Sequence, residues 1–472
     1  MTLINDTIQL ERFKKIPFTL NFTIRFFNIT NADEVRIGGV PIVTEVGPYI
    51  YKLDQHRIIE DMEDDVIRYR RRDIFQFDPV ASYPNTEDDI VTIINPAYHL
   101  VLQTAQARFP ALMVALPAAM SGIFGPNNNP VMNGRVGDLL FDGVPLCRNP
   151  GLIGEIACIQ IRSLAEDIQN VELQPDGSLM FAFLRYKNDT ESEEYVAHRG
   201  LVDPLDLGRV ITYNNSTHFD YWVRDDDEPG RCNMINGTDG GVFPPFVSRD
   251  RSIFAMDTDI CRSVELRYQY DTDYEGIPVF RYALNEWFLD NNEGCFCLNV
   301  TKADGLNRDN GCLLKGAAEM FSCVGAFMVM SYPHFLYADF RYRNGLLGLN
   351  AVEEKHRLFL DLEPLTGTII RAAKRAQFNV FQRSVPSIAA TQPLRTTLMP
   401  IFWVEEGMSL PEEFVDEIKS KLLSTLNLVN ILLPIAIALS CLVVALGIAI
   451  IVRYTVMKKN DEIPSTVPER TK

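Results

Sequence analysis

Cysteine is the residue type whose spacing in this sequence most directly suggests chemistry. Cys295 and Cys297 are separated by one residue, and Cys312 closes the same stretch, which reads CFCLNVTKADGLNRDNGC. Two cysteines one residue apart do not easily bridge to each other, because the short chain between them resists disulfide geometry. Each is therefore expected to find a distant partner. The spacing favours structural disulfides over a redox or zinc motif.

The remaining cysteines and the glycosylation sequons favour an oxidising compartment. Of nine cysteines, eight precede residue 330, and the ninth, Cys441, lies in an apolar run. Eight is even, as complete pairing requires. Asn-x-Ser/Thr sequons begin, all before the apolar run, at Asn5, Asn21, Asn28, Asn188, Asn214, Asn215, Asn236 and Asn299. We expect a secreted or lumenal face, with glycans at the sites from Asn21 onward.

The sequence contains none of the common catalytic or metal-binding motifs. The sequence has no G-x-S-x-G nucleophile elbow, no H-E-x-x-H, no Gly-rich phosphate loop and no C-x-x-C. The stretch DTDYEG (271–276) imitates the start of a calcium loop, but Tyr282 stands where that loop needs a bidentate glutamate. A turn is the favoured interpretation. The sequence thus predicts no enzyme, no catalytic residue, no metal site and no cofactor.

An apolar run is the least ambiguous element. It extends over 22 residues without a charge, from Ile431 to Val452. At about 1.5 Å per helical residue it can cross a hydrocarbon core of about 30 Å. A buried core helix is the alternative, although core helices are seldom uniformly apolar along their whole length. Arg453, Lys458 and Lys459 follow at once, as on a cytoplasmic flank.

The chain is therefore expected to have three segments. They are an extracellular ectodomain over 1–421, a transmembrane helix over 422–452 and a short cytoplasmic tail over 453–472. No linker rich in Pro, Gly or Ser and no internal repeat divides the first segment. Since the sequons and the paired cysteines all precede the helix, the ectodomain should lie outside the plasma membrane.

Net charge excludes nucleic acid as a partner. The chain has a formal charge of −17, residues 422–472 contribute +2, and residues 1–421 therefore carry −19. Such a charge repels phosphate backbones. The basic run RYRRRD (68–73) follows the acidic run EDMEDD (60–65) and continues into apolar residues. We interpret it as a strand with a solvated face, the alternative being a basic patch.

Strand patterns dominate, with helical patterns in two places. The stretch FTLNFTIRFF (18–27) alternates apolar and polar residues with the period of a half-buried strand. Further strands are predicted at 178–186, 264–270 and 277–284. Helices are predicted over 99–125 and 409–423, the second with a capping box formed by Ser409 and Glu412.

Several longer stretches resemble the class B scavenger receptor family, which includes fatty acid translocase and the lysosomal integral membrane protein. They are FFNITNADEVRIGGVPIVTEVGPYIY (26–51), GTDGGVFPPF (237–246), YEGIPVFRY (274–282), YPHFLYAD (332–339) and LDLEPLTGTIIRAAKRAQFNV (360–380). Within that family, LFDGVPLC (140–147) and TLMPIFWVEEGMSL (397–410) are most similar to the sensory neuron membrane proteins of insects.

The resemblance implies a disulfide pairing and a topology. Cys232 should pair with Cys295, Cys261 with Cys323 and Cys297 with Cys312, and Cys147 and Cys158 could form a fourth bridge. The family has a transmembrane helix at each end, whereas this chain begins MTLINDTIQLERFKK, without an apolar segment. We expect a truncated sequence, the alternative being a true single-pass form.

The resemblance also implies an α+β fold. This is a large lumenal domain with an antiparallel β-barrel core, a hydrophobic tunnel and a helical head at about 99–165. A barrel with apolar inward faces can enclose a lipid-sized cavity. The run FPALMVALPAAM (109–120) is apolar on every side, and buried core is the alternative to tunnel lining. Candidate tunnel residues are Phe109, Leu112, Met113, Leu116, Met120 and Arg135.

Three functions follow as hypotheses. The preferred one is a membrane receptor that binds a hydrophobic odorant or pheromone and delivers it through the tunnel to an odorant receptor complex. The second is a scavenger receptor that takes up fatty acids, sterols, carotenoids or lipoproteins. The third is a lipid hydrolase, against which the missing nucleophile motif counts. Partners would be a hydrophobic small-molecule or lipid ligand and the bilayer.

Ligand charge is the last expectation. Relatives that take fatty acids have a lysine near the head, whereas GPNNNPVMNGRVGDLL (125–140) contains Arg135 as its one cation. The ectodomain charge also repels anions at low salt. We therefore expect neutral aldehydes, alcohols or esters to be preferred over the matching acids.

Overall fold

The computed structural model describes residues 2–222, 230–290 and 294–461. The chain forms two compact units. The first contains the residues up to Thr272 and from Pro278 to Ser409. The second contains Asp273–Ile277 and the chain from Leu410 onward.

A sheet of 14 strands, counted over the described residues, builds the first unit. At its centre, β1 (Leu20–Ile29) pairs antiparallel with β2 (Val43–Glu63) and with β19 (Thr397–Ser409). Outward from β2 follow β3 (Val66–Phe77), β10 (Tyr195–His198) and β11 (Val210–Tyr213). Outward from β19 follow β18 (Ile369–Gln382), β17 (Phe359–Leu362), β14 (Ile277–Leu284), β13 (Arg262–Tyr274) and β12 (Ile253–Asp257). The short strands β9 (Thr190–Glu191), β15 (Ala318–Glu319) and β16 (Val329–Ser331) pair beside this path.

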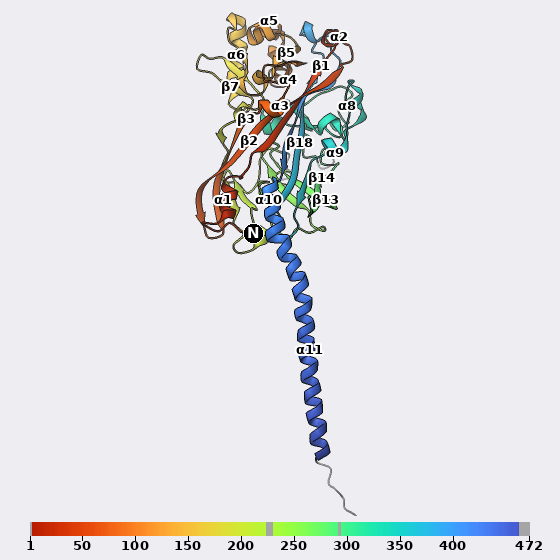
Figure 1. Cartoon of the computed structure of the whole chain (residues 1–472). Coiled ribbons are helices and arrows are strands. Elements are labelled where there is room, and N and C mark those ends of the chain that lie inside the picture. Colours follow the sequence, from red (N-terminus) through yellow and green to blue (C-terminus); the bar gives the residue numbers. More distant parts are fainter. Residues whose placement is uncertain (1, 223–229, 291–293, 462–472) are drawn as a thin grey trace, which may run out of the picture. The chain divides into compact units, whose positions relative to one another are not determined.

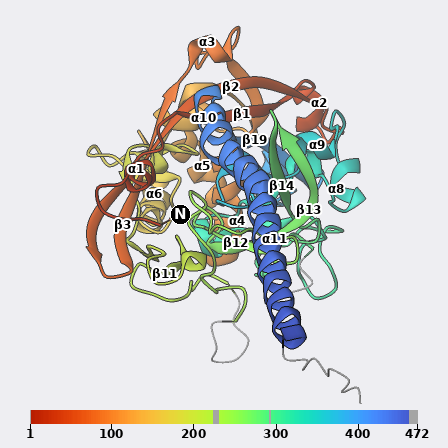
Figure 2. The same ribbon diagram turned by 60° about the horizontal axis from the view of Figure 1, so that its bottom comes forward.

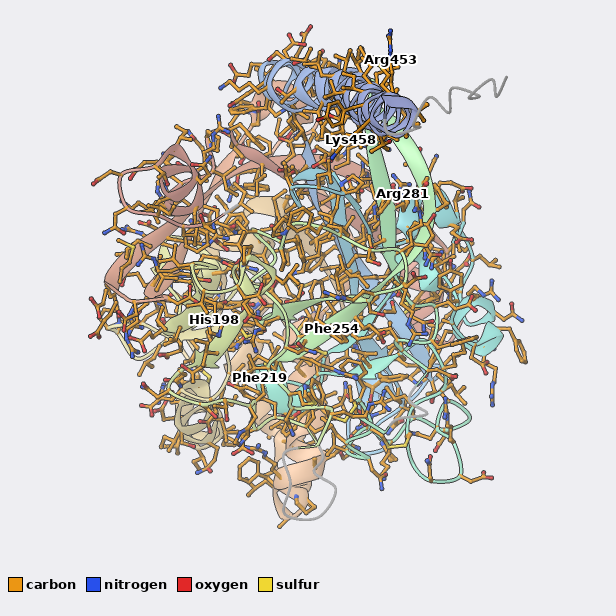
Figure 3. All side chains as sticks on the ribbon, turned by 90° about the horizontal axis from the view of Figure 1, so that it is seen from below. His198, Phe219, Phe254, Arg281, Arg453 and Lys458 are labelled. Carbon is orange, nitrogen blue, oxygen red and sulfur yellow. A yellow bond between two sulfur atoms is a disulfide. The ribbon has the colours of Figure 1, made fainter. Side chains whose placement is uncertain are left out.

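The sheet curls into a nearly closed barrel. Between its edge strands β11 and β12, the segment at Gly237 and Thr238 bonds to both: Val210 N–H donates to the Gly237 carbonyl at 2.8 Å, and Met256 N–H to the Thr238 carbonyl at 2.7 Å. Figure 2 shows β3 and β11 on one side of the ring and β13 and β14 on the other. Figure 3 labels Phe254, on β12. The antiparallel barrel implied by the resemblance is confirmed.

Helices gather at one end of the barrel, as Figure 1 shows, in what we call the head. Its helices are α4 (Pro96–Arg108), the 3₁₀ helix η1 (Pro110–Val114), α5 (Leu116–Phe124) and α6 (Gly151–Ala165). Two small sheets accompany them: β4 (Ile90–Ile94) with β5 (Val131–Arg135), and β6 (Val144–Leu146) with β8 (Leu179–Phe181) and β7 (Val171–Leu173).

The helical stretch predicted over 99–125 is interrupted. α4 ends at Arg108, and Phe109 takes a non-helical backbone with φ −132° and ψ 51°. The cause is Pro110, because the residue before a proline is pushed away from helical angles. The break turns one predicted helix into three segments that surround a space.

The other helices of the first unit are short. They are α1 (Ile8–Lys14), α2 (Ala32–Arg36), α3 (Pro79–Ser82), α7 (Phe321–Val324), α8 (Phe340–Asn344) and α9 (Glu353–His356). α1 lies at the opposite end of the barrel from the head (Figure 1). Its Leu10 and Phe13 are buried, and the Phe13 ring meets Tyr69 edge-on at 5.2 Å between centroids.

One of the predicted strands is shorter than expected, and another forms as predicted. The strand predicted at 178–186 ends at Phe181, because the Asn170 side chain donates to the Phe183 carbonyl and takes that backbone out of a ladder. The run at 68–73 lies within β3, as predicted. The side chains of Arg70 and Arg72 are 33% and 39% exposed and pair with carboxylates that are also exposed. The side chain of Arg71 is only 16% exposed and pairs with Asp73.

The second unit is mostly helical. α10 (Glu412–Glu417) continues through the π-helix η8 (Ile418–Leu423) into α11 (Ser424–Asp461). Together they give an apolar helix, Glu412–Lys458, long enough to cross a membrane. The predicted capping box is wrong. Ser409 cannot cap the helix because it is still part of β19. The N-cap residue is Pro411, which makes no side-chain cap bond. Arg453 and Lys458, labelled in Figure 3, follow the apolar run.

Candidate ligand-binding site

An apolar cavity lies in the head, with a volume of about 150 Å³. Its walls come from α4, η1, α5 and α6, with additions from the small sheets and from Ala326. Only Thr104 and Gln160 among the lining residues are polar. The lining consists of Ala97, Leu100, Val101, Thr104, Ala105, Phe109, Leu112, Ala115, Leu116, Ala119, Ile123, Leu146, Ile153, Ile156, Ala157, Gln160, Ile161, Leu164, Ile168, Val171, Phe181 and Ala326.

A close approach of two helices sets the width of this cavity. A Cβ on Gly122 of α5 would lie 2.2 Å from the Pro150 carbonyl oxygen and 3.0 Å from the Gly154 Cα of α6. Both glycines are therefore required by contact, since no side chain fits between the backbones. With the helices this close, their lining residues converge on one space.

A disulfide fixes α6 against its neighbours. Cys147, which follows β6, is joined to Cys158 within α6, the same pair that the resemblance implies. The Cys147 N–H donates to the Ile123 carbonyl of α5 at 2.7 Å. α5, α6 and β6 are thus linked at a point next to Ile123 and Leu146, which both line the cavity.

The cavity reaches the protein surface through an apolar rim. Ile153 and Ile156 line it, yet they remain 52% and 63% exposed. Leu152, next to Ile153 in the chain, and Val114, next to the lining residue Ala115, are 88% and 90% exposed. An apolar ligand would contact the apolar side chains of the rim before it reaches the apolar lining of the cavity. Its desolvation can therefore begin at the rim.

The six residues predicted for the tunnel lie in three different surroundings. Phe109, Leu112 and Leu116 line the cavity. Met120 is buried in the core at 2% exposure, and Met113 packs partly buried against that core. Met120 and Met113 therefore follow the core interpretation of 109–120. Arg135 lies on β5, away from the lining.

Arg135 is surrounded by carboxylates. Its guanidinium lies 2.8 Å from Asp88, 2.9 Å from Asp138 and 2.6 Å from Asp142. Hydrogen bonds to Asp142, Asp88 and Asp138 raise its pKa above the ordinary value. With three acidic partners for one cation, the cluster has no excess positive charge to attract a ligand carboxylate.

Sequence reasoning missed the wall formed by α6. Ile153, Ile156, Ala157, Gln160, Ile161 and Leu164 all line the cavity. They recur at steps of three and four, the period of one helix face. That periodicity was available in GLIGEIACIQIRSLA (151–165). Phe181 and Ala326 carried no local signal, because only the fold brings them to the cavity.

Three further disulfides link segments that follow the head in the sequence. The structure joins Cys232 to Cys295, Cys261 to Cys323 and Cys297 to Cys312, again the pairs that the resemblance implies. Each neighbour in the Cys295/Cys297 pair thus bonds a distant cysteine. No group of three metal-binding side chains occurs over the described ranges.

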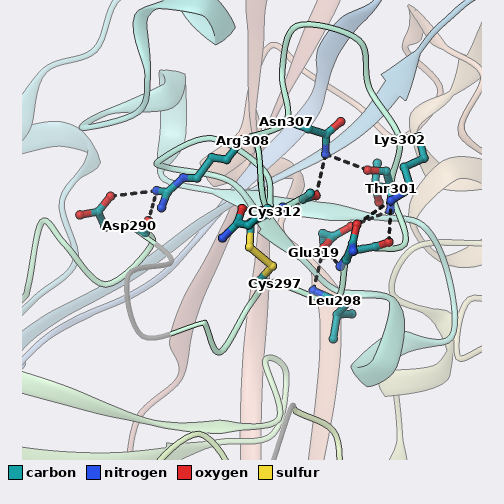
Figure 4. Close-up of a disulfide and its surroundings, with 12 residues drawn as sticks. Asp290, Cys297, Leu298, Thr301, Lys302, Asn307, Arg308, Cys312 and Glu319 are labelled. Atoms are coloured by element: carbon teal, nitrogen blue, oxygen red, sulfur yellow. Dashed lines mark hydrogen bonds and ion pairs between the residues drawn. A yellow bond between two sulfur atoms is a disulfide. The ribbon is translucent and has the colours of Figure 1, made fainter.

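A single carboxylate holds the loop after Cys297 (Figure 4). Glu319, 1% exposed, accepts from the N–H groups of Leu298, Asn299 and Thr301 at 2.8, 3.0 and 2.7 Å. Three donors on one carboxylate fix the backbone of the loop, because charge-assisted hydrogen bonds are among the stronger ones.

The predicted glycosylation sites differ in accessibility. Asn21, Asn214, Asn215 and Asn299 are exposed, and Asn28, Asn188 and Asn236 are half-buried. The side-chain Oδ1 of Asn28 accepts from Thr92 N–H at 2.7 Å, and Oδ1 of Asn188 accepts from Phe75 N–H at 2.9 Å. In both, the amide nitrogen that would carry a glycan is left free of these bonds. Glycosylation itself remains a prediction.

Buried histidines occur in both the head and the barrel. His99 on α4 is 2% exposed, and burial lowers its pKa to about 4. His356 is 4% exposed and stacks on His334 with 4.4 Å between ring centroids. Burial and the neighbouring His334 ring lower the pKa of His356 to about 4. Both His99 and His356 are therefore neutral at physiological pH.

Comparison with other proteins gives a consistent result. The sequence profile of the CD36 family matches residues 1–451. Sensory neuron membrane protein 2 of Drosophila melanogaster is 33% identical, with 92% of this chain and 89% of that protein covered. The protein of the same name from Aedes aegypti is 32% identical, over 91% of this chain and 88% of its own length. Sensory neuron membrane protein 1 of Helicoverpa assulta is 30% identical, over 99% and 88%.

Proposed function

This chain belongs to the CD36 family of membrane proteins, and from that premise we propose that it is a receptor for a hydrophobic odorant or pheromone. In this proposal, the ligand enters the apolar cavity of the head and passes along an internal tunnel. It then reaches an odorant receptor complex in the plasma membrane. No bond in the ligand is made or broken, so the protein acts as a binding module and not as an enzyme.

The observation that carries the proposal is the chemistry of the head cavity. Twenty of its 22 lining residues are apolar, and its rim is apolar as well. An apolar cavity of about 150 Å³ has room for a small apolar molecule or for a segment of a longer aliphatic chain. An aliphatic chain, which needs no hydrogen-bond partner, matches such a lining, whereas a polar metabolite would lose its hydration there.

The sensory role is supported by the relatives. Those found at 30 to 33% identity are named sensory neuron membrane proteins 1 and 2. A membrane anchor also suits delivery to a receptor in the bilayer, and the second unit supplies one helix long and apolar enough to serve. The extracellular ectodomain and the cytoplasmic tail belong to the same proposal.

Ligand charge is the finer part of the proposal. Residues 1–421 carry −19, and Arg135 is committed to three aspartates. A fatty acid carboxylate would meet repulsion without a matching cation in the head. The receptor should therefore prefer a neutral ester, aldehyde or alcohol to the acid of equal chain length.

A binding experiment tests this function. The full chain in lipid nanodiscs is titrated with a neutral long-chain ester and with the matching acid. Ala157→Phe places a ring in the cavity, and Ala118→Phe places the same ring at an exposed position of α5 outside the lining. The ester should bind the native chain and the Ala118→Phe variant but bind Ala157→Phe at least tenfold more weakly. Equal binding by both variants would remove the head cavity from the proposal.

Delivery needs its own measurement. Cells that carry an odorant receptor tuned to the ester are recorded with and without this chain. We expect the chain to lower the ester concentration that evokes a response, and Ala157→Phe to abolish that gain. A preference for the acid, lost in Arg135→Ala, would instead favour uptake of fatty acids.

A further inference from the structure

A network of four charged side chains lies inside the barrel, away from the head cavity. Asp259 accepts from Lys187 Nζ at 2.7 Å and from Lys374 Nζ at 2.8 Å. Lys374 Nζ also lies 2.8 Å from Asp257 Oδ2. Two ammonium groups and two carboxylates thus form one connected set with no net charge.

The connectivity of the sheet places this network in the interior. Lys374 is on β18, and Asp257 ends β12. Three strands, β17, β14 and β13, separate β18 from β12 along the sheet. A side chain that bonds directly across that distance must cross the space enclosed by the curled sheet and cannot run along its outer surface.

The space around Lys374 is not filled by protein. Its side chain keeps 36% of its surface accessible, and Asp259 keeps 27%. Burial lowers the pKa of Lys374, but Asp257 and Asp259 raise it more, and the pKa lies well above the ordinary value. Because the network lies inside the curled sheet, this accessible surface of Lys374 faces an enclosed chamber and not the outer surface of the barrel.

One wall of this chamber is apolar. Ala372, Ala376 and Phe378 lie on the same face of β18 as Lys374, because side chains two residues apart share a face. Met408 lies opposite Ala372 on β19. All four are partly accessible, so hydrocarbon and charge border the same enclosed space.

Beyond the network, the polar layer continues and contains unsatisfied atoms. Arg57 bonds Asp239 at 2.7 Å, yet its Nη2 has no hydrogen-bond partner among the described residues, and neither has the Tyr69 hydroxyl. Arg57 is 4% and Tyr69 0% exposed. Protein closes off both atoms, and a Cβ on Gly241 would lie 1.8 Å from Arg57 Nη2, so this part of the layer is tightly packed and leaves no room for a ligand.

This layer separates two hydrophobic cores. The larger core includes the head and the central strands, and the smaller core contains Leu10 and Phe13 of α1 with Tyr69 and Tyr195. Tyr195 lies next to the layer, because its ring stacks on Tyr69 at 5.2 Å between centroids. Hydrocarbon therefore does not run continuously through the barrel.

We propose that Lys187, Lys374, Asp257 and Asp259 form a second binding site, for the neutral polar head group of an amphiphile whose chain lies against Ala372, Ala376 and Phe378. The class of ligand is a long-chain alcohol, aldehyde or ester. Either lysine can donate to a hydroxyl or carbonyl oxygen, and either aspartate can accept from a hydroxyl. The inference rests on the proposed function and adds to it an orientation and a stopping point.

Charge decides the class of head group. The network already sums to zero, so a carboxylate would bring an uncompensated charge into a desolvated site. A neutral head group exchanges its hydrogen bonds to water for bonds to groups that are already paired and held in place.

Photolabelling tests the position of the head group. The full chain in nanodiscs is irradiated with a long-chain alcohol that bears a diazirine next to the hydroxyl. We expect adducts in peptides that contain β12 and β18, competed by the unlabelled alcohol. Competed adducts confined to α4, α5 and α6 would overturn this second site while leaving the head cavity in place. Absence of any competed adduct would count against the proposed function as well.

A variant series tests the role of the charges. Affinity is measured for an alcohol and for the alkane of equal length in the native chain, in Lys374→Met and in the control Lys355→Met, whose lysine is exposed on α9. One net hydrogen bond predicts that the native chain and the control favour the alcohol about 2- to 10-fold. Lys374→Met should lose that preference. An unchanged preference in Lys374→Met would overturn the site.

A second variant keeps the site testable if Lys374→Met does not fold. Ala376→Leu adds volume to the same face of β18 without touching the charges. It should weaken binding of alcohol and alkane alike by at least threefold, because the larger side chain takes up space that the ligand chain would occupy. Unchanged affinities for both ligands would contradict the placement of the chain.

Discussion

The head and the barrel interior both enclose space, but the head cavity is lined almost entirely by apolar side chains, whereas charged side chains border the space in the barrel. The head cavity has two polar residues among 22 and reaches the surface through an apolar rim. The barrel chamber is bordered by four paired charges as well as by the apolar face of β18. An apolar cavity leaves no polar group without a hydrogen-bond partner, and its cost is the packing that its lining forgoes. A charged chamber is stable only while every charge keeps its partner.

The largest effect should come from breaking the charged network. Asp259→Ala leaves Lys187 without its carboxylate and removes one of the acidic neighbours of Lys374, which keeps Asp257 and Glu406. Loss of one member of a buried pair typically destabilises by about 3 to 5 kcal/mol. The free energy of unfolding, from denaturant titration, measures this. Asp271→Ala breaks an ion pair to Arg249 that is about half exposed on both sides, and serves as the control. Its cost should stay below about 1 kcal/mol. Similar losses in both variants would mean that the barrel charges are solvated like surface ones.

Disulfides offer a second contrast between barrel and head. Cys261 and Cys323 are 62 residues apart in sequence, whereas Cys147 and Cys158 are 11 apart. Chain entropy predicts about 4 kcal/mol lost when the first pair is changed to alanine and about 3 kcal/mol for the second. Denaturation midpoints of the two double variants test the order. A larger loss from the head pair would show that the disulfide acts mainly by holding α6 in place.

Acid should destabilise both regions through their neutral histidines. His99 in the head and His356 beside the barrel each have a folded-state pKa of about 4, below the unfolded value of about 6.5. The unfolded chain therefore binds protons first, and stability present above pH 6.5 is lost as the pH falls towards 4. Each histidine contributes about 3 kcal/mol across that window. Unfolding titrations of His99→Gln and His356→Gln at pH 7 and pH 5 should each show a shallower pH dependence. A slope unchanged from that of the native chain would place the proton uptake elsewhere.

The smallest effect on stability should come from the rim of the head. Ile156→Ser changes a side chain that is 63% exposed, so the free energy of unfolding should move by no more than about 0.5 kcal/mol. Ligand association should slow, because the rim loses apolar surface. Stopped-flow binding of the neutral ester measures this, with Val202→Ser, at an 84% exposed position in the barrel region, as the control. Equal rates in the two variants would make the rim irrelevant to entry.

The sequence predicted best what depends on local pattern. The alternation in 18–27 predicted β1, and the uncharged run from Ile431 predicted the apolar part of α11. It predicted less well where a distant group intervenes. The strand at 178–186 ended early because Asn170 takes its carbonyls, and the capping box failed because Ser409 stays in the sheet.

The two enclosed spaces differ in the same way. Part of the head cavity was predictable, since Phe109, Leu112 and Leu116 lie in one apolar run and α6 shows a helical period. Nothing local marks Lys187, Asp259 and Lys374 as partners, because 115 residues separate Lys374 from Asp259. Their meeting depends on the closure of the sheet, which no short stretch of sequence encodes.

The clamp at Glu319 imposes an order on the maturation of the protein. Within the sequon that starts at Asn299, Thr301 is 3% exposed and its N–H is bonded to Glu319. An enzyme that transfers a glycan must grip an extended, accessible Asn-x-Thr, which the folded loop no longer offers. Any glycan on Asn299 should therefore be added before Glu319 binds this loop. The fraction of chains that carry a glycan at Asn299 would then report how long this loop remains unfolded during maturation.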